Sequence, residues 1–360
     1  MRPALKAGLL PVWRDRETVQ IGIDPRRAVA LTGMGSAAPV LALLDGSRDR
    51  GEVIAAALEL GVPELVTDRI LTVLAVAGAL DDFPVAAIRA LAPGRRQQLG
   101  AELAAAALAR GHSDAGATAL ARRDAASVRV FGPGRLATAI ADILTTSGVS
   151  HVAISDLVRR AGPPARTPAA ARAAEDRTSQ PGDTPAVPGG RRSRGRVAGR
   201  AAPGGECRKD EGEAAPPVPD LAIVTGRPGS GLRAWLMRAG VPHLTAAAEE
   251  AIGVVGPLVR PGRTACLRCL DITRASLDPA WPLILAQVAG RTAEPPACDA
   301  ALAAAVAAQA AAQALGFLDR SPHASPAENG TLELVLPGWQ WRRRSWPPLA
   351  ACGCCQLPAA

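Results

Sequence analysis

Five cysteines in two clusters have the spacing of metal ligands. Cys266 and Cys269 form a C-x-x-C pair, and Cys352, Cys354 and Cys355 form a second cluster near the end of the chain. Two thiolates at C-x-x-C spacing can reach one zinc ion from a turn, and a second pair completes a tetrahedral site. We therefore predict a zinc site of Cys266, Cys269, Cys352 and Cys355, with Cys354 as the alternative to Cys355. Four sulfur ligands leave no open coordination position, so this zinc would be structural and not catalytic.

A glycine-rich turn suits a phosphate group. Gly132, Gly134 and Arg135 stand in G-P-G-R-L-A, which fits the pattern G-x-G-x-x-A. Such glycines let the backbone approach a phosphate, and the following helix N-terminus supplies unpaired N–H groups. Asp156, about twenty residues further on, could accept hydrogen bonds from ribose hydroxyls. We predict Gly132, Gly134, Arg135 and Asp156 as nucleotide-binding residues, although a tight strand-to-helix turn also needs glycine without any ligand.

The elements around this turn have the order of a Rossmann-type unit. A buried strand is expected at 128–131, a helix from 136 to just before Gly148, and a second strand at 151–155 that ends at Asp156. Further along we expect a strand at 220–225, a helix at 232–239, a strand at 241–244 and a strand pair within 249–259. This alternation predicts an α/β sheet covered by helices, formed by residues 127–158 and 219–360.

Residues 1–85 have the pattern of a small winged-helix-like α+β domain. Val19, Ile21 and Ile23 alternate with polar or small residues, as in a strand, and three short helical stretches follow. These stretches lack a basic face, so we expect no binding to DNA. A winged helix can instead bind a peptide by adding it as a strand to an exposed sheet edge.

Two segments differ from these units in composition. Residues 86–126 are rich in Ala, Leu and Arg and are expected to form a helical connector. Residues 159–218 consist mainly of Pro, Gly, Ala, Arg and Ser. Such a composition cannot bury enough apolar surface to offset the entropy of ordering, which predicts a disordered insertion.

The overall composition argues against a nucleic-acid-binding protein. The chain has 360 residues, of which 48% are hydrophobic and 2% aromatic, and its net charge is +8. Much of that charge stands in the insertion without aromatic residues for base stacking. Five of its arginines cluster in one stretch: Arg191, Arg192, Arg194, Arg196 and Arg200.

The sequence predicts a cytoplasmic protein. The first residues, MRPALKAGLLPVW, lack an apolar run of signal-peptide length. The apolar run Ala300–Leu315 is mostly alanine and shorter than the about 20 residues that a membrane span needs. We expect it to be a buried helix, with a homodimer face as the alternative. Unevenly clustered cysteines favour metal or thiol chemistry over disulfides. Cys207 and Cys298 stand outside both clusters, and we expect neither to be catalytic.

The glycine turn, the acid beyond it and the two cysteine clusters together resemble the ThiF/E1-like adenylyltransferase superfamily. Finer features resemble actinobacterial ThiF-like proteins of azoline-forming ribosomal peptide (TOMM) gene clusters. These features are VWRDRETVQIGIDPRRAVAL, VGPLVRPGRTACLRCLDITRASLDPAWPLILAQ, CDAALAAAVAA, TLEL and RSWPPLAACGCC. The resemblance implies a Rossmann-like ThiF-type domain, a winged-helix element that binds the leader of a precursor peptide, and a YcaO-type cyclodehydratase partner that consumes the ATP.

The chain departs from active members of that superfamily at the phosphate site. Active enzymes hold ATP with an arginine-bearing segment and a lysine, and hold magnesium with an aspartate after a later strand. In this chain the insertion stands where the arginine-bearing segment and the lysine would be, and its lone lysine is Lys209. Gly226, after Thr225, stands where the magnesium-binding aspartate would be. Nothing then balances the γ-phosphate and Mg²⁺ charges. We therefore predict a non-catalytic adaptor that binds the leader peptide with residues 1–85 and docks the cyclodehydratase.

Two other functions fit parts of the sequence. A working adenylyltransferase of the ubiquitin-like-modifier-activating type would bind ATP and Mg²⁺ at the glycine turn and activate the C-terminus of a peptide or small protein. An NAD(P)-dependent oxidoreductase would use the same glycines. The chain has no tyrosine and its four histidines are scattered, so no hydride-transfer site is evident.

Overall fold

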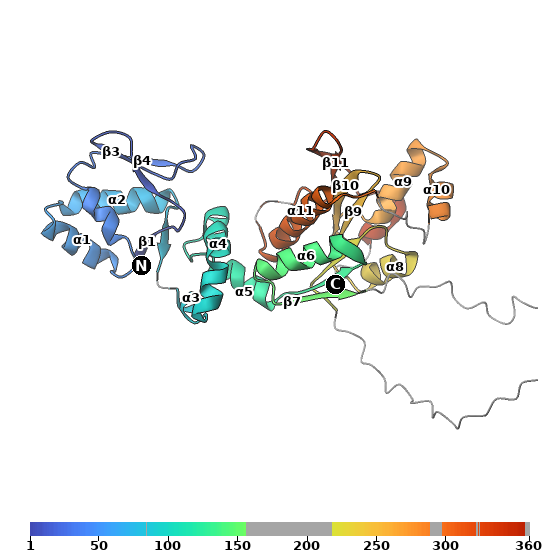
Figure 1. Cartoon of the computed structure of the whole chain (residues 1–360), viewed down its shortest axis with the longest axis horizontal. Coiled ribbons are helices and arrows are strands. Elements are labelled where there is room, and N and C mark those ends of the chain that lie inside the picture. Colours follow the sequence, from blue (N-terminus) through green and yellow to red (C-terminus); the bar gives the residue numbers. More distant parts are fainter. Residues whose placement is uncertain (84, 156–217, 289–296, 322, 324, 357–360) are drawn as a thin grey trace, which may run out of the picture. The chain divides into compact units, whose positions relative to one another are not determined.

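The computed structural model describes residues 1–83, 85–155, 218–288, 297–321, 323 and 325–356 (Figure 1). By their contacts, the described residues within Met1–Val158 and Pro219–Ala360 belong to one unit. Asp156, Cys207, Lys209 and the predicted insertion, except Val218, lie outside the described residues.

The N-terminal part combines small antiparallel sheets with short helices, as the sequence predicted. Its elements are β1 (Pro3–Leu5), β2 (Pro11–Trp13), β3 (Thr18–Ile21), β4 (Val29–Thr32), the 3₁₀ helix η1 (Ala38–Leu43), α1 (Arg50–Glu59), α2 (Glu64–Val76) and β5 (Leu80–Asp82). Strands β2, β3 and β4 form one sheet in that order, and β1 pairs with β5. Helix α1 begins with a capping box in which Asp49 and Glu52 bind each other's backbone N–H groups, which fixes its start.

Three helices follow where a helical segment was expected. They are α3 (Ala86–Arg89), α4 (Pro93–Arg110) and α5 (Ala117–Ala125). Ile88, Leu99, Leu103 and Ala117 form their small core. Because these apolar residues recur at helical spacing, the helices pack on one another through one face.

One sheet of seven strands forms the α/β part of the chain, as the alternating pattern predicted. The strands are β6 (Ser127–Phe131), β7 (His151–Ser155), β8 (Leu221–Thr225), β9 (His243–Glu249), β10 (Ile252–Val259), β11 (Gly330–Val335) and β12 (Gln340–Ser345). Their order is β12-β11-β10-β9-β8-β6-β7. The neighbours from β7 to β9 are parallel, and those from β9 to β12 are antiparallel. The parallel strands place the end of β6 and its glycine turn at the same sheet edge as the end of β8.

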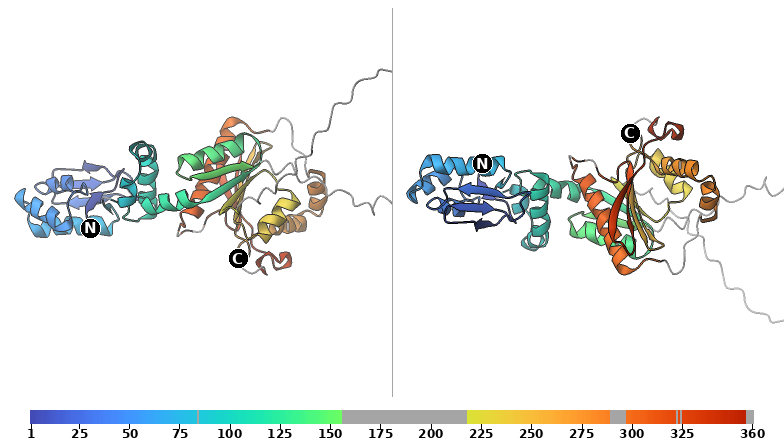
Figure 2. Two further views of the ribbon diagram at one scale, coloured as in Figure 1. Left: turned by 90° about the horizontal axis from the view of Figure 1, so that it is seen from below. Right: turned by 90° about the horizontal axis from the view of Figure 1, so that it is seen from above.

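Helices cover both faces of this sheet (Figures 1 and 2). Helices α6 (Gly134–Thr146) and α11 (Ala300–Leu318) pack on one face, and α8 (Ser230–Arg238) packs on the other. Helices α9 (Leu267–Leu277) and α10 (Trp281–Val288) follow β10. Among the described helices, only α11 is long and apolar enough to cross a membrane, and half of it is buried inside the protein. Its packing on the sheet confirms the prediction of a buried helix.

The predicted boundaries of β9 and β10 were wrong. Strand β9 runs through Ala246 and Ala248 to Glu249, where the sequence predicted a break after Leu244. Alanine has a low strand propensity, but pairing with β8 and β10 on both sides decides the conformation. A two-residue turn at Glu250 and Ala251, with φ of 54° and 58°, then joins the two strands.

Gly253 lets α11 approach β10 closely. A Cβ atom at this position would overlap Val306 Cγ2 on the helix. We expect Gly253→Ala to lower the free energy of unfolding by about 1–3 kcal/mol, because the helix must shift. The matched control is Gly316→Ala in α11, where a Cβ would meet nothing within 4 Å. That change should stabilise the protein by up to about 1 kcal/mol in urea unfolding. Equal effects of the two changes would contradict this packing.

A buried histidine should make stability depend on pH. His243 is 1% exposed, and its Nδ1 lies 2.9 Å from the Val241 carbonyl oxygen. Burial lowers the pKa of His243 from 6.5 to about 4. The unfolded chain therefore binds a proton between pH 6.5 and 4 that the folded chain does not, so stability falls as pH decreases through this range. Between pH 7.5 and pH 4, the free energy of unfolding of the wild type, measured in urea, should fall by on the order of 3 kcal/mol more than that of His243→Gln. Parallel pH profiles for the two proteins would be the contrary result.

Candidate functional site

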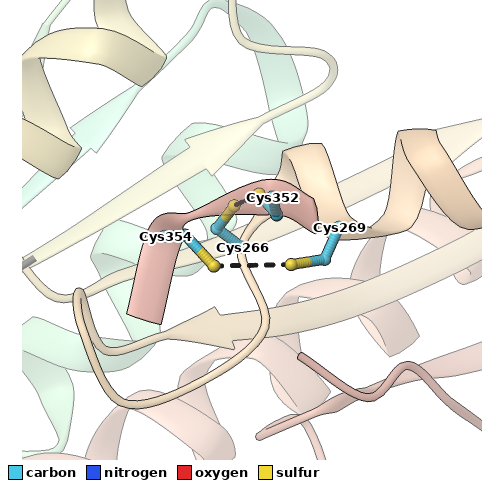
Figure 3. A group of neighbouring side chains, drawn as sticks. All are labelled: Cys266, Cys269, Cys352 and Cys354. Atoms are coloured by element: carbon cyan, nitrogen blue, oxygen red, sulfur yellow. Dashed lines mark hydrogen bonds between the residues drawn. The ribbon is translucent and has the colours of Figure 1, made fainter. Parts of the chain in front are cut away.

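Four cysteine sulfurs meet beside the antiparallel part of the sheet (Figure 3). The Sγ atoms of Cys266 and Cys352 lie 3.5 Å apart, and those of Cys269 and Cys354 lie 3.4 Å apart. All four sulfurs lie within 4.8 Å of one another, and all four residues are buried. Two segments about 85 residues apart in the chain therefore share one cluster.

Local backbone structure presents each sulfur to the cluster. Cys266 is the N-cap of α9, and Cys269 follows in its first turn, where its N–H donates to the Cys266 carbonyl at 2.9 Å. Cys352 ends one short 3₁₀ helix and Cys354 begins the next. Gly353 joins them with a φ of 72°, a conformation that glycine adopts readily.

The structure brings Cys354 into the group in place of Cys355, which corrects the sequence-based choice. Cys355 is exposed, and its Sγ lies 3.7 Å from the Cys354 sulfur, outside the four-sulfur group. The left-handed Gly353 reverses the chain, so the first two cysteines of the C-G-C-C segment, Cys352 and Cys354, join the cysteines of α9. The spacing alone left both pairings open.

This group can hold a metal ion. A metal–sulfur distance of about 2.3 Å in a tetrahedral site places the sulfurs about 3.8 Å apart, close to the separations here. Burial and the neighbouring Cys266 thiol raise the pKa of Cys352 to about 11. Burial also raises the pKa of Cys354. At Cys269 burial acts in the same direction, but hydrogen bonds to the backbone of Leu349 and Cys266 outweigh it, so the pKa of Cys269 is lowered. A bound cation would displace the remaining thiol protons.

Apolar and cationic side chains enclose the cluster. Val259, Leu270 and Trp346 pack around the cysteines. The Arg274 guanidinium lies 5.2 Å from the centre of the Trp346 ring and 4.9 Å from that of Trp281. These contacts hold α9 and α10 against the segment before the second cysteine pair.

The glycine turn has the geometry of a strand-to-helix turn with open space above it. Gly132 has a φ of 131°, and a Cβ there would overlap Thr225 Oγ1 on β8. Packing alone therefore requires the first glycine. Gly134 has a φ of 84° and opens α6, and a Cβ there would meet nothing within 4 Å. Arg135 is exposed beside it, while Asp156 lies outside the described residues.

A glutamate that sequence analysis did not single out lies at the same edge. Glu249 ends β9, and its Oε1 would lie 3.7 Å from a Cβ on Gly226. Gly226 follows β8, where active E1-like enzymes were expected to carry an aspartate. Acidic residues directly after a strand can indicate a site at the sheet edge, and Glu249–Glu250 is such a run. The sequence predicted that this strand ends at Leu244, so the run was not assigned to the edge.

The fold matches solved structures of MccB and of heterocyclases. Over 99% of this chain and 100% of the other, it matches E. coli MccB with AMPCPP and MccA, with a TM-score of 0.61 and 14% identity. The chain has the ThiF/E1-like fold. The chain also matches the heterocyclase TruD, with a TM-score of 0.61 and 14% identity over 98% of this chain and 42% of TruD.

A third structure extends the comparison. A heterocyclase in complex with substrate and cofactor matches with a TM-score of 0.61 and 13% identity over 99% of this chain and 39% of the other. The chain thus spans the whole length of MccB but about two fifths of the heterocyclases. No family model and no curated protein matches its sequence.

The cysteine geometry makes a ligand-specific prediction. A metal ion held by these four sulfurs should be lost in Cys354→Ser, and the free energy of unfolding should fall by on the order of 3 kcal/mol, because one ligand is removed from a buried site. Cys355→Ser is the matched control and should retain one metal ion per chain, measured by elemental analysis. Metal loss from Cys355→Ser but not from Cys354→Ser would refute this ligand set.

Proposed function

We propose that the chain is a non-catalytic ThiF-like adaptor. It binds the leader of a ribosomally made precursor peptide and presents the peptide to a YcaO-type cyclodehydratase in azole or azoline peptide biosynthesis. The observations that carry this proposal are an open strand edge and a helix with exposed apolar side chains, both in the N-terminal part. The likeness of the whole chain to MccB, which is known in complex with the peptide MccA, supports it.

The peptide site proposed here consists of β4 and α2 in a winged-helix-like unit. Among the described strands, β4 pairs only with β3, so its other edge offers free N–H and C=O groups. Helix α2 exposes Leu65 at 81% and Val76 at 85%, with Val66 and Val73 between them. These positions lie on one side of the helix, where the exposed Arg69 and Thr72 stand between them, and we call this side the stripe. A leader peptide that adds to β4 would gain backbone hydrogen bonds from the strand and apolar contacts from the stripe.

The absence of catalysis rests on charge at the phosphate edge. Gly226 stands where magnesium would need a carboxylate, and Arg227, the next residue, lies over the Trp281 ring at 5.6 Å. A phosphoryl or adenylyl transfer site needs positioned cations and carboxylates around the developing charge. The partner cyclodehydratase would therefore consume the ATP.

The cysteine group would hold structural zinc in this adaptor. Its four buried sulfurs match the donor set of structural zinc sites and leave no position for a substrate. The ion would bind the end of the chain to α9 and stabilise the fold. The adaptor would act in the cytoplasm, where thiols stay reduced.

An ATP-dependent adenylyltransferase is the second candidate. Two observations favour it: the open space at Gly134, and Glu249 beside Gly226 as a substitute carboxylate. Calorimetric titration of zinc-replete protein with ATP and Mg²⁺, beside Asp156→Ala, separates the two functions. Micromolar binding that Asp156→Ala abolishes would support the enzyme, and no binding supports the adaptor.

The exposed stripe gives the main test of the adaptor. The full chain should bind the precursor leader encoded in its own gene cluster, measured by fluorescence anisotropy. Leu65→Glu should weaken binding roughly tenfold, because a charge replaces an apolar contact of about 1.4 kcal/mol. Leu277→Glu on α9, where the leucine is 78% exposed, is the matched control and should bind as the wild type. The proposal fails if the wild type does not bind, or if both variants bind equally.

A further inference from the structure

The outermost strand of the large sheet, β12, is an unusual edge. All six of its residues, Gln340–Ser345, are exposed. Within the described residues it pairs only with β11, so it closes one end of the seven-stranded sheet (Figure 2). Its sequence, QWRRRS, places three arginines and a tryptophan on a strand that has free backbone groups.

The free backbone groups belong to alternate residues. The N–H of Trp346, just beyond the strand, donates to the Asn329 carbonyl at 2.8 Å, on the β11 side. In an antiparallel ladder the direction alternates from one residue to the next. Trp341, Arg343 and Ser345 therefore direct their N–H and C=O groups away from β11, where another strand can pair with them.

The side chains give this edge a positive charge. Arg344 Nε lies 3.4 Å from Glu333 Oε1, which balances one of the three arginines. Arg343 donates to the carbonyl oxygens of Pro326 and Glu328 at 2.9 and 3.2 Å, so its charge is held in place without a carboxylate. Arg342 is exposed and makes no ion pair with any described residue. Trp341, on the face opposite Arg342, is 36% exposed.

These charges disfavour a second copy of the same chain as the occupant. A symmetric antiparallel pair of β12 strands that uses these outward groups would centre on Arg342 or on Arg343, and either register places arginine opposite arginine. Like charges directly opposite each other destabilise strand pairing. Charged edge strands also prevent aggregation, but that role needs no exposed tryptophan beside the charges.

We propose that β12 binds an acidic, extended segment of a partner protein by strand addition. The incoming strand would pair with the free groups of Trp341, Arg343 and Ser345, place a carboxylate beside Arg342, and place an apolar residue against Trp341. This interface is separate from the leader site on β4 and α2, so neither proposal depends on the other.

The test uses the full chain and labelled ten-residue peptides. A peptide of alternating Glu and Val should bind, measured by anisotropy, with slowed amide exchange at Trp341, Arg343 and Ser345. A peptide of alternating Lys and Val, and the acidic peptide with proline at alternate positions, should each bind at least tenfold more weakly. Arg342→Glu should cause a similar loss for the acidic peptide.

Two controls locate the interaction. Arg238→Glu, at an exposed arginine on α8, should leave the affinity unchanged. Leu65→Glu should also leave it unchanged, which separates this edge from the leader site. The proposal is overturned if the acidic peptide does not bind, if proline or Arg342→Glu has no effect, or if amide protection falls on β4. Dimerisation through β12, seen by sedimentation with the wild type but not with Arg342→Glu, would also overturn it.

Discussion

The contact between α11 and β10 supports most of the α/β structure. Alanines on the buried face of α11 and Gly253 on the strand leave little side chain between the two backbones, so the helix lies directly on the sheet. Leu302, Val306 and Leu318 then join the core that α6 also buries. This close approach explains why a helix with so few large residues packs stably: small residues increase the number of atoms within van der Waals contact.

The residue after α11 binds α11 to the connector helix α5. Asp319 follows the helix and accepts hydrogen bonds from Arg123 on α5 at 2.8 and 2.9 Å. Arg123 also donates to the Ser147 carbonyl beyond α6. The ion pair is buried, so its partners must stay together, because either charge alone would lack solvation. Three helices thus meet at one bidentate pair.

The glycine turn and the cysteine group both contribute to the packing of the fold. Gly132 is required by its contact with Thr225 on β8, whether or not a nucleotide binds. The cysteine group holds the chain end against α9 and offers no substrate position. Both features are needed for the fold. A chain that no longer transfers phosphoryl or adenylyl groups would therefore still retain them, which is consistent with the adaptor proposed here.

The sequence by itself determined the local elements. Helical periodicity located α2 and α6, the glycines that end α1 and α8 located those helices, and a long apolar run located α11. The strand–turn–helix order located β6 and the glycine turn. All these signals depend on neighbouring residues. Only the tertiary structure decided which cysteine completes the group, since Gly353's left-handed backbone directs Cys354 inward. Tertiary pairing also extended β9 through its alanines and brought Glu249 beside Gly226. Such choices depend on residues distant in sequence, and spacing does not encode them.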